Sequence, residues 1–245
     1  MSENPATPPR PATPEPPAPS THPAQPGQSA QPGHPAQPGQ PGPPDLGPVT
    51  ERVAALLDGV GEDRFDDPTP CPELPVRALL SHLLGLTLAF RDAARKDLGP
   101  LTDVSPEDPH ASVPPLDGDW RGRLRAQLAE LADAWRDPAA WQGATRAGGI
   151  DLPGEVAGAV ALNEVLIHGW DLARATGQPY DVDPDSAAVS VTLLAADADD
   201  PAARERGPFG PAHLVPDGAT PLQRAVALSG RSPSWTPSWT PTAGA

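Results

Sequence analysis

Cysteine, positive charge and long apolar runs are all scarce in this sequence, and each shortage excludes something. Cys71 is the only cysteine, so no disulfide can form within the chain, and we expect a reducing, cytoplasmic location. No apolar run approaches the ~20 residues that span a bilayer, and the N-terminus lacks a signal-peptide pattern, so we expect no membrane. The formal net charge of −15 argues against nucleic acid and anionic membranes as partners.

The first 45 residues lack the side chains that build a core. They contain no Leu, Ile, Val, Phe, Trp or Tyr, hold many of the chain's 38 prolines, and repeat HPAQPGQ at 22–28 and 34–40. Such a segment cannot bury enough apolar surface to offset its ordering entropy. We predict a disordered Pro/Gly/Gln-rich tail over residues 1–47, with PxxP spacings that suit docking to a protein partner. We interpret His22 and His34 as repeat residues of a solvated linker rather than as metal ligands.

The remainder of the chain shows helical periodicity. Apolar residues recur at helical spacing in the stretches 48–65, 76–97, 117–137 and 153–175. A polar loop is expected over 97–117, and shorter helices are expected at 184–197 and 220–229. We predict an all-α fold, with an up-and-down four-helix bundle over residues 48–178 and a small C-terminal appendage over residues 179–245. In the stretch 117–137, Trp120 and Trp135 belong to one apolar stripe, so we interpret them as core residues.

The fourth stretch carries polar groups inside apolar surroundings. In NEVLIHGWDLARATG, residues 163–177, Glu164, His168 and Asp171 fall within about 60° of one another on a helix. On an exposed helix, Glu164 and His168 would be an ordinary i,i+4 pair. This helix is apolar almost all round, and a buried charge needs a partner. Two interpretations remain, a buried ion pair or two metal ligands one turn apart.

A metal needs a third ligand, and His82 is the candidate. It lies on an otherwise apolar face of the stretch 76–97, where the alternative is a hydrogen-bonded core histidine. His110 and His213 lie in predicted loops and are poorer candidates. His82, Glu164 and His168 form a His₂Glu set with one coordination position open, as in catalytic zinc sites, although iron and nickel also accept these ligands. Asp171 would then be the acceptor that orients His168 from behind.

Cys71 lies in a proline-rich loop and has two interpretations. A nucleophilic thiol requires an electropositive, partly exposed setting. The neighbouring acidic residues Asp66, Asp67 and Glu73 argue against that setting. We therefore expect a structural, partly buried cysteine.

Three motifs resemble a known family. TPCPELPVRALLSHLLG (69–85), NEVLIHGWDLARATGQ (163–178) and GPFGPAHLVPDGATPLQRAVALSGRSPSW (207–235) resemble the DinB-like, mycothiol-dependent maleylpyruvate isomerase superfamily of actinobacteria. The Ala-, Pro- and Arg-rich composition also suits an actinobacterium. The resemblance implies a four-helix bundle that binds divalent zinc through His82, Glu164 and His168 and uses mycothiol as cosubstrate. The C-terminal part is shorter than in the isomerase itself, so metal binding carries over and the specific isomerisation does not.

Three functions are compatible with these motifs. The first is a metal- and mycothiol-dependent transferase or isomerase acting on a small electrophile. The second is a non-catalytic module that binds a metal and a thiol without turnover. The third is a scaffold whose proline-rich tail recruits a protein partner. The same ligand residues serve the first two, so the sequence does not separate them.

Overall fold

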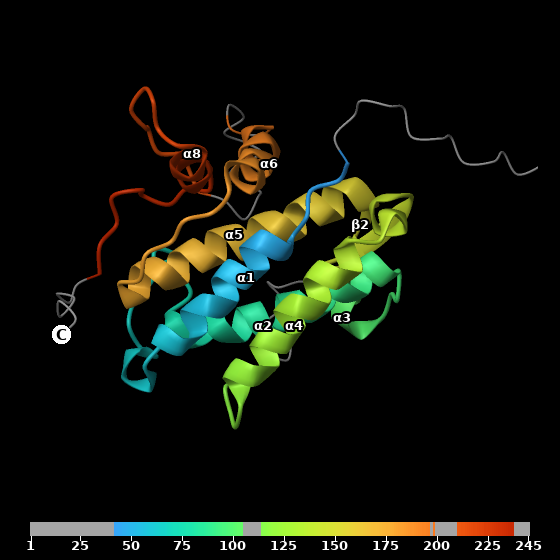
Figure 1. The fold of residues 1–245 in the computed structure, drawn as a ribbon, viewed down its shortest axis with the longest axis horizontal. Coiled ribbons are helices and arrows are strands. Elements are labelled where there is room, and N and C mark those ends of the chain that lie inside the picture. The colour runs from blue at the N-terminus through green and yellow to red at the C-terminus, as the bar shows by residue number, and fades with distance from the viewer. Residues whose placement is uncertain (1–41, 105–113, 197, 199–209, 238–245) are drawn as a thin grey trace, which may run out of the picture. The chain divides into compact units, whose positions relative to one another are not determined.

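Helices make up most of the described chain, which confirms the mostly helical fold expected from the apolar periodicity. The computed structural model describes residues 42–104, 114–196, 198 and 210–237. Residues 1–41, for which we predicted disorder, lie outside the described residues. The same holds for His22 and His34 within them and for His110. The four predicted long helices correspond to α1 (Gly47–Leu56), α2 (Val76–Arg95), α4 (Trp120–Trp135) and α5 (Gly154–Thr176) (Figure 1).

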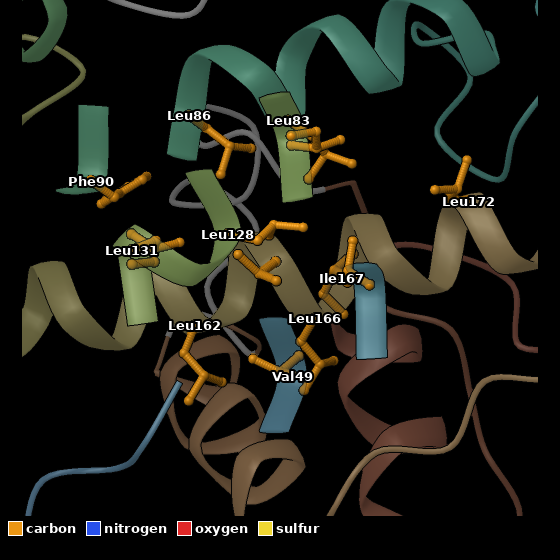
Figure 2. Close-up of a cluster of buried hydrophobic side chains, with 14 of the residues drawn as sticks. Val49, Leu83, Leu86, Phe90, Leu128, Leu131, Leu162, Leu166, Ile167 and Leu172 are labelled. Carbon is orange, nitrogen blue, oxygen red and sulfur yellow. The ribbon is translucent and has the colours of Figure 1, made fainter. Parts of the chain in front are cut away.

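These four helices pack around a shared apolar core. Helix α2 contacts α4 and α5, and α1 contacts the same two helices. Figure 2 shows the side chains that fill the space between them, among them Val49, Leu83, Leu128 and Leu166. The predicted stripe of α4 is buried along its whole length: Trp120, Leu124, Leu128, Leu131 and Trp135. Burial of large apolar side chains is the main driving force that holds α2 and α5 side by side.

The C-terminal region adds two short helices. Helix α6 (Pro184–Ala195) contacts α5, and α8 (Pro221–Leu228) contacts α6 (Figure 1). The Thr220 side chain accepts a hydrogen bond from the Gln223 backbone and caps α8. After α8, Gly230 has a φ of 79°, a left-handed conformation that ends helices. Trp235 then packs against the core, and its carbonyl accepts hydrogen bonds from Arg174 on α5.

The all-α prediction is wrong between α4 and α5. Residues Ala144–Ala147 (β1) and Ile150–Pro153 (β2) pair as an antiparallel hairpin. Gly148 and Gly149 both have positive φ at its turn, as two-residue hairpin loops require. Strands of four residues show at most a minimal alternating pattern, so the Gly148–Gly149 pair was the main local signal of this hairpin.

The polar loop expected over 97–117 also contains a short helix, α3 (Pro100–Asp103). Helix α3 contacts β1, and the Thr102 carbonyl accepts a hydrogen bond from the Gly149 amide. The remaining single-turn 3₁₀ segments are Leu57–Gly59, Glu62–Arg64 and Pro138–Trp141. Among the described residues, no helix combines the length and the apolar composition needed to span a bilayer.

At Gly158, helix α5 approaches a pair of tryptophans closely. The rings of Trp135 and Trp141 meet edge to face, with centroids 5.0 Å apart. A Cβ on Gly158 would overlap ring carbons of Trp141 and lie 2.8 Å from Cζ3 of Trp135. We expect Gly158→Ala to lower the free energy of unfolding by about 1–3 kcal/mol, because rigid rings must move. Urea unfolding measures this change.

Gly85 in α2 provides the matched control. A Cβ there would meet only Pro114, at 3.7 Å, which is an ordinary contact. Alanine is the better helix former by about 0.5–1 kcal/mol, so Gly85→Ala should leave stability unchanged or raise it. Equal effects of the two substitutions would contradict the steric argument.

Candidate metal centre

Helices α2 and α5 bring the three predicted ligands together. His82 lies on α2, and Glu164 and His168 lie one turn apart on α5. Glu164 Oε2 is 3.5 Å from His82 Nε2 and 3.3 Å from His168 Nε2. One ligand atom from each residue lies within 4.8 Å of the others. The carboxylate therefore stands between two imidazoles contributed by different helices.

The two distances from Glu164 to the histidines are close to those of a tetrahedral metal site. Zinc bonds of about 2.0–2.1 Å to nitrogen and oxygen place neighbouring ligand atoms about 3.3–3.4 Å apart. The side chains of His168, Glu164 and His82 are 9, 21 and 26% exposed, so one side of the cluster reaches solvent. The three donors are of the kinds that bind a divalent cation, and the cluster is partly accessible from solvent.

Asp171 occupies the position expected for an orienting acceptor. Its side chain is fully buried, and Oδ2 lies 3.0 Å from Nδ1 of His168. A proton on Nδ1 that is donated to this carboxylate leaves the lone pair of His168 on Nε2. Nε2 is the nitrogen that faces Glu164. In the neutral imidazole, this hydrogen bond selects the tautomer that a metal requires.

Arg231 is a member of the site that the sequence analysis missed. It lies just after α8, and Nε and Nη2 approach Asp171 Oδ1 and Oδ2 at 3.3 and 3.1 Å. Its Nη1 also donates to the Ser229 carbonyl. Only 9% of the residue is exposed, so this is a buried, two-pronged ion pair. The sequence offered only an indirect sign of this arginine. A carboxylate buried at Asp171 requires a positively charged partner, but the sequence does not say which residue provides it.

Hydrogen bonds across the cluster shift its proton equilibria. Burial by itself lowers the pKa of His168, but hydrogen bonds to Asp171 and Glu164 outweigh it and raise this pKa to about 9. Burial by itself raises the pKa of Glu164, but hydrogen bonds to His168 and His82 outweigh it and hold this pKa far below its usual range. Glu164 is therefore ionised throughout the neutral range, as a carboxylate ligand must be. His168 is protonated at neutral pH without a metal, so a bound cation has to displace the Nε2 proton.

Cys71 and His213 lie outside the ligand set. Thr69 Oγ1 accepts a hydrogen bond from the Cys71 amide and donates to the carbonyls of Cys71 and Leu74, which fixes the proline-rich loop. Burial raises the pKa of the Cys71 thiol, although the charge of Arg231 acts in the opposite direction. A raised pKa favours the structural interpretation of this cysteine. His213 is exposed on the loop before α8.

Fold and cluster together define a mostly helical protein with a candidate His₂Glu metal centre. Residues 46–173 match the family model described as the mycothiol maleylpyruvate isomerase N-terminal domain. The chain belongs to this family, which confirms the resemblance seen in its motifs.

Relatives and a solved structure agree with this assignment. Uncharacterized proteins from two strains of Mycobacterium tuberculosis are each 32% identical over 185 residues, spanning 73% of this chain and 91% of the relative. The crystal structure of a histidine-to-alanine mutant of mycothiol-dependent maleylpyruvate isomerase superposes with a TM-score of 0.54. It covers 77% of this chain and 87% of the other at 19% identity, and it therefore shows a shared fold alone.

Proposed function

We propose that this protein binds a divalent cation, zinc, through His82, Glu164 and His168, and uses it to activate a small-molecule thiol. The thiol we propose is mycothiol, and the reaction is its transfer to a small electrophile or the isomerisation of that electrophile. The observation that carries the proposal is the meeting of three metal-ligating atoms from two packed helices at a partly exposed face. Membership of a family described by mycothiol dependence supports mycothiol as the cosubstrate.

The residues around the cluster have separate tasks. Nε2 of His168 is held toward Glu164 by the hydrogen bond from Nδ1 to Asp171. Glu164 supplies negative charge between the two imidazoles and offsets the charge of a cation. A bound divalent cation would lower the pKa of an incoming thiol from about 8.5, so that the reactive thiolate forms at neutral pH. The exposed side of His82 and Glu164 is where such a thiol would enter.

Zinc is the metal we propose because of the donor set. Two imidazoles and a carboxylate with a fourth position open are the ligands of several catalytic zinc sites. Iron and nickel accept the same donors, so the metal has to be identified by measurement.

A non-catalytic thiol-binding module is the alternative, and the environment of Asp171 favours it. The Asp171 carboxylate is fully buried and engaged by His168 and Arg231, so it is not free to move a proton during a reaction. Turnover would then depend on the thiolate alone. A scaffold role of the proline-rich tail concerns residues 1–41, which lie outside the described residues.

The test is a search for thiol-dependent turnover. Zinc-loaded protein, with His22→Gln and His34→Gln so that the tail binds no metal, is incubated with mycothiol and a panel of small electrophiles. We expect consumption of at least one electrophile that requires both thiol and metal. His213→Gln, an exposed histidine outside the cluster, should retain the activity.

The alternative functions predict different results. Zinc-loaded protein that binds mycothiol in calorimetry but turns over no electrophile would contradict the enzyme function. It would support the non-catalytic binding module instead. If the protein shows neither turnover nor thiol binding, both proposals are contradicted. The scaffold function then remains.

A further inference from the structure

We propose that Arg231 is a positioning residue of the metal centre, acting on His168 through Asp171. The inference rests on the proposed metal binding and extends it to a part of the chain that the family model does not match. All three candidate ligands and Asp171 lie within the matched residues 46–173, whereas Arg231 lies 60 residues beyond Asp171. The C-terminal segment therefore completes a site whose ligands belong to the preceding helices.

The geometry connects the three side chains in series. Oδ2 of Asp171 lies 3.0 Å from His168 Nδ1 and 3.1 Å from Arg231 Nη2. Oδ1 of the same carboxylate is 3.3 Å from Arg231 Nε. A guanidinium that meets both oxygens sets the plane of the carboxylate, and that plane sets the direction from which Nδ1 of His168 is held.

Arg231 is itself fixed at several points. Its Nη1 donates to the Ser229 carbonyl, and Ser229 is the C-cap of α8. The turn that follows α8 requires the left-handed conformation of Gly230. The buried residues Ala225, Val226 and Ala227 anchor α8, the helix that precedes this turn. The position of the C-terminal segment thus determines where the guanidinium of Arg231 meets the Asp171 carboxylate on α5.

A second contact ties the same segment to α5 and provides a control. Nε of Arg174 donates to the Trp235 carbonyl at 3.1 Å. This contact holds the segment four residues beyond Arg231 and includes none of the candidate ligands or Asp171. We expect the loss of this contact to loosen the C-terminal segment and to leave the bonds between Arg231, Asp171 and His168 in place.

The experiment compares variants of the whole chain, in the His22→Gln, His34→Gln background, by zinc affinity and by the state of His168. Zinc affinity is measured by competition with a chromogenic chelator. Proton–nitrogen NMR of ¹⁵N-histidine-labelled, zinc-loaded protein reports whether a slowly exchanging Nδ1–H of His168 is present. We expect Arg231→Met to weaken zinc binding about 10- to 100-fold and to lose this signal. Arg231→Lys keeps the positive charge but lacks the planar guanidinium that binds two oxygens. We therefore expect it to retain part of the zinc affinity and part of the Nδ1–H signal. Arg174→Met should stay within about twofold of the parent, with the signal intact.

Circular dichroism establishes that each variant is folded. Unchanged zinc affinity and an unchanged Nδ1–H signal in Arg231→Met would overturn the inference. Equal weakening by Arg174→Met would also overturn it, because docking of the segment would then be the cause. If Arg231→Met does not fold, Arg231→Lys decides: parent-like affinity and signal there would refute positioning by the fork. A parent that binds no zinc would refute the proposed metal site itself, and with it this inference.

Discussion

Replacement of any one of the three candidate ligands is expected to empty the metal centre. Parent protein in the His22→Gln, His34→Gln background should bind about one zinc per chain. His82→Ala or His168→Ala leaves two donors, and we expect the affinity to fall at least 100-fold, because each lost donor removes a large share of the binding free energy. Mass spectrometry of the metal content after gel filtration measures the stoichiometry.

Glu164→Gln isolates the contribution of the carboxylate charge. The substitution keeps the size of the side chain but removes the anion that stands 3.3 and 3.5 Å from the two imidazole nitrogens. We expect a loss of zinc comparable to that of the histidine variants, whereas the exposed His213→Gln should bind like the parent. A parent that stays free of metal after zinc reconstitution would contradict the prediction. Glu164 and His168 would then be the buried ion pair that the sequence left as an alternative.

Asp171→Ala is expected to produce a large loss of stability. The substitution leaves the guanidinium of Arg231 buried without its counter-ion and removes the acceptor of His168. Removing one partner of a buried ion pair typically costs about 3–5 kcal/mol. Urea unfolding of metal-free protein measures the change and keeps it separate from metal binding.

Two comparisons test the cause of this loss. Asp58 forms an ion pair with Arg125, but its side chain is 78% exposed, so Asp58→Ala should cost less than about 1 kcal/mol. The double variant Asp171→Leu with Arg231→Met removes both charges and should regain most of the lost stability. A single Asp171→Ala variant as stable as Asp58→Ala would show that Arg231 turns to solvent instead of remaining unpaired.

Helical periodicity predicted the long helices and the faces that they bury. The predicted end of the fourth stretch agrees with α5, which finishes at Thr176 before Gly177 with a φ of 70°. The apolar stripe of α4 and the polar stripe of α5 both follow from 3.6 residues per turn, which is a local property of the chain. For this reason the proximity of Glu164 and His168 was predictable without knowledge of the other helices.

The hairpin and the C-terminal arginine were not predictable in this way. The strands β1 and β2 have four residues each, and part of their environment comes from α2, where the Ala93 carbonyl accepts a hydrogen bond from Thr145. Arg231 lies after Gly230 in a segment without periodicity. The Gly148–Gly149 pair was the one local sign of the hairpin, and no local pattern distinguishes Arg231 from a residue of an ordinary loop.

The sequence by itself determined which polar groups share a face of α5 and which histidine of α2 lies among apolar residues, because both depend on helical spacing alone. Only the tertiary structure decided that His82 faces Glu164 and that Arg231 neutralises Asp171. These contacts join residues 82 and 60 positions apart in the chain. The packing of buried apolar faces determines which helices become neighbours, and buried charges then require partners among the residues that this packing brings close.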